Sequence, residues 1–306
     1  MSLGVLNNIS ALYAENNLNN TQNALQNTLQ QLSSGTTLNS GADNPAGLSL
    51  ADGLSANSAA LTQSATNASD GVGLLQVADG ALSQVNSLLN SAVTLATEAS
   101  NGTLNSTQDA AANQEYQSIL SEINNIGSTT TYNSTAVFSS TATATTTSIY
   151  TGDSSSAGAS VDSLSFSELS SSSVGTTGGT ITLTAASGTA AATISETGVS
   201  AGQDLSSTDL TSSSDAMTAL TSLNAAISDV ASQRGYLGSQ INTLNSVSGV
   251  ETTEEENLTS AENSISATNY GSATTAMSQE QVLTQTGISA LAQANSSQND
   301  ILKLLQ

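Results

Sequence analysis

Leucine and alanine recur at alternating intervals of three and four residues near both ends of the chain, the spacing of one face of a coiled-coil helix. In the N-terminal half the series begins at Leu54 and runs to Ala99 without losing register. Pro45 is a favoured first residue for a helix, so the pattern predicts one helix over residues 45–99. Such a helix would be about 80 Å long at about 1.5 Å per residue, a length typical of coiled coils and helical bundles.

The C-terminal third carries the same spacing. One series runs from Leu220 to Leu244, and another from Ile288 to Leu305. A shorter apolar stripe predicts a helix over residues 115–126. The stripes are rich in alanine and interrupted by asparagine, glutamine and serine, so each helix buries little area by itself. This favours a bundle that neighbouring helices or subunits complete.

The middle of the chain has a different pattern, with β-branched residues, glycines and almost no charge from about residue 127 to 215. Short alternations such as residues 180–184 (TITLT) predict strands with one buried face. We therefore expect a small β-rich insert between two helical halves. A disordered Ser/Thr-rich linker is the alternative reading of the same composition.

A shorter series with the same spacing runs from Leu18 to Leu32 and predicts a first helix. The stretch LQQLSSGTTLNSGADNPAGLSLADGL, residues 29–54, connects this series to the one that begins at Leu54, and it contains the only proline of the chain. Gly35 is suited to end the first helix in a left-handed conformation. Asp43 or Asn44 can cap the next helix, with Pro45 at its first position. The stretch is therefore predicted to be a loop that connects two helical segments.

The composition excludes most catalytic chemistry. The chain of 306 residues has no His, Cys or Trp, so triads, thiolates and imidazole zinc sites are impossible. A carboxylate-based hydrolase or a Ca²⁺ site is the surviving alternative, but the acids of the insert are scattered. In ETTEEENL, residues 251–258, the pairing of Thr252 with Glu255, or of Thr253 with Glu256, predicts a capping box that opens a helix. We therefore expect no enzyme, no cofactor and no metal.

The chain is strongly acidic. It has 24 Asp and Glu against two basic residues, Arg234 and Lys303, for a net charge of −22. A cationic surface for nucleic acid or for an anionic membrane is missing, so neither is an expected partner. Two hypotheses account for the charge: assembly in acid, near the isoelectric point of about 4.1, or resistance to trypsin-like proteases.

Motifs at both ends resemble bacterial flagellin. The stretch 29–54 is similar to the N-terminal signature of that family, in which a leucine-rich segment precedes SSG and then N-S-x-x-D-[DN]-x-AG-L. At the other end, SQRGYLGSQINTL, NLTSAENSISATNYGSAT and VLTQTGISALAQANSSQNDILKLLQ resemble the flagellin C-terminal region. The resemblance covers residues 1–138 and 216–306. Residues 1–17 lack the features of a cleaved signal peptide, in line with the export route of that family.

The resemblance implies a mainly α fold: a long coiled-coil-like helical rod built from both termini, with a small β-rich outer insert. It also implies a structural subunit that polymerises into the extracellular flagellar filament and serves swimming motility, with a hook–filament junction protein as the alternative. The implied partners are other copies of the chain, an export chaperone, and cap and junction proteins. The expected divisions are 1–44 for the N-terminal inner-tube helix and joint, 45–138 and 216–256 for the two halves of the rod, 139–215 for the variable outer domain, and 257–306 for the C-terminal inner-tube helix.

For a filament subunit the functional site is its assembly interface. Spacing and resemblance together predict two groups of interface residues. The predicted interface residues are Leu3, Leu6, Ile9, Leu302 and Leu305 for the inner tube, and Leu75, Leu82, Leu89, Leu223, Ile227 and Ile241 for the rod seam.

Arg234 falls on the apolar face of its predicted helix. We expect it either to form an ion pair with Glu115 or Glu122 on a facing helix or to extend its side chain into solvent.

Overall fold

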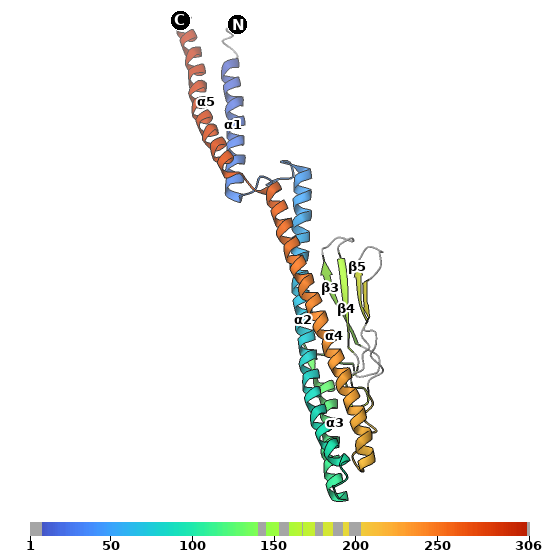
Figure 1. The fold of residues 1–306 in the computed structure, drawn as a ribbon. Helices are drawn as coiled ribbons and strands as arrows, with labels where there is room; N and C mark the ends of the chain where they lie inside the picture. Colours follow the sequence, from blue (N-terminus) through green and yellow to red (C-terminus); the bar gives the residue numbers. More distant parts are fainter. Residues whose placement is uncertain are drawn as a thin grey trace. The chain divides into compact units, whose positions relative to one another are not determined.

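A computed structural model describes residues 8–139, 145–152, 159–166, 168–174, 180–185, 192–195 and 203–304. The chain divides into two compact units. A terminal unit comprises Met1–Ser55 with Leu258–Gln306, and a central unit comprises Ala56–Asn257. The fold is mainly α with a small strand region, as the sequence predicts (Figure 1). Each unit is described by itself below.

Three helices form the body of the central unit (Figure 1). These are α2 (Pro45–Ser100), α3 (Ser106–Thr129) and α4 (Ser213–Ser266). The start of α2, up to Ser55, and the end of α4, from Leu258, belong to the terminal unit. The start of α2 at Pro45 and its unbroken course confirm the long helix that the sequence predicts. Along α2 a buried face repeats every three and four residues, with Leu61, Ala68, Leu75, Ala78, Leu82, Val85, Leu89, Ala92, Ala96 and Ala99 at 0–1% exposure.

The sequence predicts a buried face of α4 that runs from Leu220 to Leu244, and the structure confirms only every second position of it. At the positions between, the buried residue is the one just before the predicted residue. Leu223, Val230, Leu237 and Leu244 are buried as expected. The positions between them are filled by Ala226, Gln233 and Gln240, whereas Ile227, Arg234 and Ile241 lie one residue along, at the partly covered edge. Small and amide side chains fit the narrow space between helices, and the larger side chains pack beside it.

Two small antiparallel sheets belong to the central unit. A two-residue hairpin pairs β1 (Thr131–Tyr132) with β2 (Thr135–Ala136) directly after α3. A second sheet has the order β3-β4-β5-β6. This confirms a β-rich region between the helical halves, and strand β5 covers the predicted alternation at 180–184. The bounds in the second sheet are Thr145–Gly152 for β3, Ala159–Phe166 for β4, Thr180–Ala185 for β5 and Ala192–Ser195 for β6.

The sheet region contributes apolar side chains to the same core as the helices. Leu164 and Phe166 of β4 are buried, and the Phe166 ring lies edge-on to Phe138 with centroids 6.3 Å apart. Gly127, near the C-terminal end of α3, lies so close to the Leu169 backbone that a Cβ at this position would overlap the Leu169 carbonyl oxygen. The insert is therefore packed onto the helices through a common core.

In the terminal unit, α1 (Ile9–Ser34) and α5 (Tyr270–Leu304) lie side by side and antiparallel (Figure 1). Near one end Asn8 donates from Nδ2 to the Ala294 carbonyl at 3.1 Å. Near the other, Thr28 Oγ1 donates to Glu280 Oε1 at 3.2 Å. The pairing brings together segments that are more than 250 residues apart in the chain.

The connection between α1 and α2 agrees with its prediction. Gly35 ends α1 in the left-handed region, with φ of 76°. Asn44 caps α2, because its Oδ1 accepts from the Gly47 amide at 2.9 Å. Asp43 instead ties the loop by accepting from the Asn39 and Ser40 amides at 3.1 and 2.8 Å.

The predicted capping box at residues 252–256 is wrong, since α4 continues to Ser266. Instead of capping a new helix, the Thr252 and Thr253 hydroxyls donate to the carbonyls of Ser248 and Gly249, four residues back. Such bonds keep a threonine within a continuous helix. Residues 267–269 are not helical and separate α4 from the next helix, and Thr268 donates from its amide to the Gly35 carbonyl at 2.9 Å.

Candidate assembly site

The α1–α5 pair leaves much of its apolar surface uncovered. Thr28 is the only buried residue of α1. On both helices, large apolar side chains stand in solvent at about half exposure or more. These are Ile9 at 60%, Leu12 at 57%, Tyr13 at 68%, Leu29 at 46%, Tyr270 at 57%, Val282 at 62%, Leu283 at 47% and Ile288 at 48%.

Eight large apolar side chains stay exposed along the two helices of one pair, and their spacing places them on more than one side of each helix. Large apolar patches on a soluble chain mark sites that another surface covers. We call these eight residues the terminal apolar face. Of the predicted inner-tube residues, Ile9 belongs to it. Leu3, Leu6 and Leu305 and the side chain of Leu302 lie outside the described residues.

The predicted rod-seam residues come together inside the central unit. Leu75, Leu82, Leu89 and Leu223 are buried at 0–1%, while Ile227 and Ile241 pack against the same core from its edge. These side chains therefore hold the subunit together. Their contribution to contacts between subunits stays a prediction.

Arg234 pairs with Asp79 of α2, so the prediction of Glu115 or Glu122 as its partner is wrong. Its Nε donates to Asp79 Oδ1 at 2.7 Å and its Nη2 to Oδ2 at 3.3 Å. The two glutamates are exposed on α3, whereas Arg234 faces α2. The hydrogen bond to Asp79 raises the pKa of the guanidinium above its usual value. Both side chains are more than a third exposed, so the pair stabilises by about 0–1 kcal/mol.

A buried polar cluster joins α2, α4 and β3. Glu251 of α4 is 4% exposed and accepts at Oε1 from the Ser64 hydroxyl of α2. The Gly152 amide at the end of β3 donates to the same Oε1 at 2.7 Å and to Ser64 Oγ at 2.6 Å. The sequence contains one indication that Glu251 is buried, because it lies seven residues, or two helical turns, after the apolar seam position Leu244. Nothing in the sequence indicated Gly152 as its partner.

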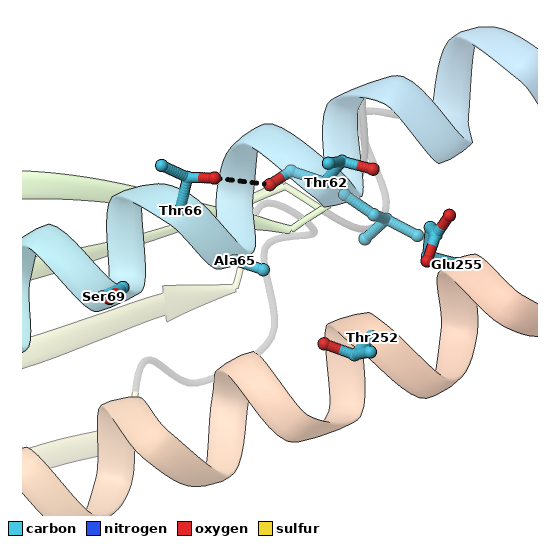
Figure 2. Close-up of a pocket in the computed structure, with 7 residues that line it drawn as sticks. Thr62, Ala65, Thr66, Ser69, Thr252 and Glu255 are labelled. Atoms are coloured by element: carbon cyan, nitrogen blue, oxygen red, sulfur yellow. Dashed lines mark hydrogen bonds between the residues drawn. The ribbon is translucent and has the colours of Figure 1, made fainter.

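One open groove runs between α2 and α4, about 420 Å³ in volume (Figure 2). Thr62, Ala65, Thr66 and Ser69 line it from α2, and Thr252 and Glu255 from α4. The Thr66 hydroxyl donates to the Thr62 carbonyl at 3.0 Å. The groove has one carboxylate and no second acid among its lining residues, so it lacks the carboxylate pair of a glycoside hydrolase.

Other chemistry is sparse in the described part of the chain. Its acidic side chains form no group of three or more suited to hold a metal ion. Its helices include none that is both long and apolar enough to cross a membrane. Most of the large apolar side chains that are exposed in the described residues belong to the terminal apolar face.

Comparison with known proteins identifies the class of these paired terminal helices. A family model described as the bacterial flagellin N-terminal helical region matches residues 5–143. A second, described as the bacterial flagellin C-terminal helical region, matches residues 220–305. Together they cover most of the chain in the expected order, and the chain belongs to the bacterial flagellin family.

Relatives among known proteins carry flagellin names. Flagellin of Halalkalibacterium halodurans is 27% identical over 299 residues, 98% of each chain. Polar flagellin C of Vibrio parahaemolyticus is 36% identical over 132 residues, 43% of this chain and 34% of that relative. Flagellin of Serratia marcescens is 42% identical over 127 residues, 41% of this chain and 36% of that relative. The chain thus spans about a third of the length of the latter two.

Among solved structures, the crystal structure of Bacillus cereus flagellin is similar with a TM-score of 0.42 and 26% sequence identity. The alignment covers 60% of this chain and 88% of that one.

Proposed function

We propose that the chain is the structural subunit of a flagellar filament that drives swimming, and that it polymerises through its terminal helices. Membership of the flagellin family supports this role. The observation that carries the mechanism is the terminal apolar face: α1 and α5 pair with each other yet leave apolar side chains exposed on both helices. Other copies of the chain are the surfaces that would cover them.

The energetics favour assembly over an isolated α1–α5 pair. Removing apolar surface from water stabilises by about 25 cal/mol per Å². The face includes eight large side chains at 46–68% exposure, so covering it with neighbouring subunits removes several hundred Å² from water, by order of magnitude. The central unit, in contrast, buries its leucines within the subunit and is suited to be a stable body between neighbours.

The remaining parts of the role follow from the family. A filament subunit acts outside the cell and performs no catalysis. Its partners would be other copies of itself, the export chaperone, and the cap and junction proteins of the flagellum. The division into inner-tube segments 1–44 and 257–306, rod halves 45–138 and 216–256, and outer domain 139–215 stays part of this proposal. The boundaries of the compact units, after Ser55 and Asn257, lie 11 residues and 1 residue from two of these limits.

Electron microscopy tests the role. The full chain, and a chain lacking residues 1–30 and 290–306, are incubated at pH 4, close to the isoelectric point of about 4.1, and at pH 7. We expect long tubes from the full chain only, because the truncation removes most of α1 and the end of α5. If neither chain forms tubes even when seeded with filaments, a junction protein becomes the better reading.

A further inference from the structure

A cavity of about 430 Å³ lies in the central unit where three segments meet. Its walls come from α2 between Asn67 and Leu74, from the β1–β2 hairpin, and from β3 between Thr147 and Tyr150. We call it the hairpin cavity. Its volume falls within the range of about 300–1,000 Å³ that small ligands occupy in proteins.

Two glycines of α2 let the other walls approach. A Cβ at Gly71 would overlap the Ile149 side chain of β3. A Cβ at Gly73 would lie 3.2 Å from the Tyr132 hydroxyl of the hairpin. The Asn67 amide further ties α2 to β3 by donating from Nδ2 to the Tyr150 carbonyl at 3.1 Å. The walls are therefore fixed to each other by side-chain packing and by a hydrogen bond.

The hairpin turn is held in an uncommon conformation. Asn133 and Ser134 both have positive φ, 48° and 63°, between the paired residues Tyr132 and Thr135. This two-residue turn suits asparagine at its first position but favours glycine at its second. A serine there is strained, and such strained residues gather at functional sites. Asn133 of this turn lines the cavity.

Six polar residues of the lining use no side-chain hydrogen bond or ion pair within the described part of the chain. Their side chains are left to water or to a ligand. They present one carboxylate, one amide, one phenol and three aliphatic hydroxyls, beside the apolar side chains of Leu74, Val137 and Ile149. The six residues are Asp70, Tyr132, Asn133, Thr135, Thr147 and Ser148.

From this lining we propose that the hairpin cavity binds a neutral saccharide unit. A sugar offers hydroxyls that both donate and accept, which match a carboxylate, an amide and hydroxyls. It also offers C–H faces, which match a tyrosine ring and aliphatic side chains. The proposal goes beyond filament assembly and does not rest on it, because every residue of the cavity lies in the central unit.

Charge selects a neutral ligand over an anionic one. Asp70 supplies the one acidic side chain of the lining, and no arginine or lysine lines the cavity. The chain has only two basic residues, and Arg234 is paired with Asp79. An anionic sugar would therefore meet repulsion from Asp70 with no cation to offset it.

The test begins with the full-length protein on an array of immobilised neutral oligosaccharides, with sialylated and sulfated ones on the same surface. We expect binding to at least one neutral oligosaccharide and none to the anionic ones. The neutral oligosaccharide that binds most tightly is then titrated by calorimetry into Asp70→Ala, Tyr132→Phe and Glu98→Ala. The last is the matched control, an exposed carboxylate on the same helix about 42 Å away.

Asp70→Ala should weaken binding about 10- to 100-fold, as expected for lost hydrogen bonds to a charged group. Tyr132→Phe should weaken it about 2- to 10-fold, and Glu98→Ala should leave it unchanged. Asp70 is exposed, so its variant should unfold at the temperature of the unaltered chain. The proposal is overturned if no neutral oligosaccharide binds, if anionic ones bind better, or if Asp70→Ala binds as the unaltered chain does.

Discussion

Replacing Glu251 by alanine should destabilise the central unit by breaking the polar cluster that joins α2, α4 and β3. The carboxylate accepts from the Ser64 hydroxyl and from the Gly152 amide. Hydrogen bonds to charged groups contribute about 1.5–3 kcal/mol each. After the change Gly152 keeps Ser64 Oγ as an acceptor, at 2.6 Å, but the Ser64 hydroxyl, 0% exposed, loses its own acceptor.

Two further effects act in opposite directions. The variant leaves a cavity at a 4% exposed position, which adds to the loss. It also removes Glu251 Oε2, a buried oxygen without a hydrogen-bond partner, which offsets part of it. The net loss should be about 2 kcal/mol. For a unit of this size that lowers the unfolding temperature by about 4–8 °C.

Thermal unfolding followed by circular dichroism at 222 nm measures the effect. Glu254→Ala, an exposed glutamate three residues along, is the control and should change stability by less than about 0.5 kcal/mol. In a double-mutant cycle, Ser64→Ala and Glu251→Ala should couple by about 1 kcal/mol. Equal unfolding temperatures for Glu251→Ala and Glu254→Ala would refute the role assigned to the cluster.

Three further predictions concern the central unit. Leu82→Ala should cost about 2–5 kcal/mol because Leu82 is 0% exposed, whereas Val77→Ala on the same helix, at 37% exposure, should cost less than about 1 kcal/mol in denaturant unfolding. Burial raises the pKa of Asp229, partly opposed by a hydrogen bond with Gln203. Because the pKa of Asp229 is higher in the folded chain than in the unfolded chain, where it is near 3.8, ionised Asp229 destabilises the fold above the folded-state pKa. Below pH 3.8 the side chain is protonated in both states and this destabilisation is absent. Asp229→Asn should therefore raise the unfolding temperature at pH 7 and leave it unchanged at pH 3. Gly127→Ala should lower the free energy of unfolding by about 1–3 kcal/mol, because the added Cβ would overlap the Leu169 backbone carbonyl. An unchanged thermal unfolding curve would contradict this packing.

Helix positions were predictable where spacing and end signals agree. For α2, leucine and alanine define the buried face, and Asn44 with Pro45 defines the start. Both signals depend on local geometry, so they can be read from the sequence. The same holds for Gly35, since a helix that ends in a left-handed residue favours glycine.

The buried face of α4 was harder to predict, because hydrophobicity alone does not decide which side chain fits where two helices pack closely together. Gln233 and Gln240 are buried, although their neighbours Arg234 and Ile241 fit the apolar spacing as well or better. Which residue faces inward depends on the distance to α2 and α3, and no property of α4 alone sets that distance. The choice of Asp79 as the partner of Arg234 follows from the same tertiary register.

The candidate sites depend even more on tertiary contacts. Ser64, Gly152 and Glu251 are far apart in the chain, and so are the three walls of the hairpin cavity. Strand register and the close approach permitted at Gly71 bring them together. Of the terminal apolar face, only Ile9 was predicted from the sequence as an interface residue, and that role stays a prediction.

The most direct test of the central claim is filament assembly by a chain whose terminal apolar face is made polar. Leu12→Ser with Val282→Ser changes two side chains that are 57% and 62% exposed. Asn20→Ser, an exposed polar position on α1, is the control. We predict that the double variant unfolds at the same temperature as the control but forms no filaments in the electron microscope when seeded. Filaments of normal length and yield from the double variant would contradict assembly through this face.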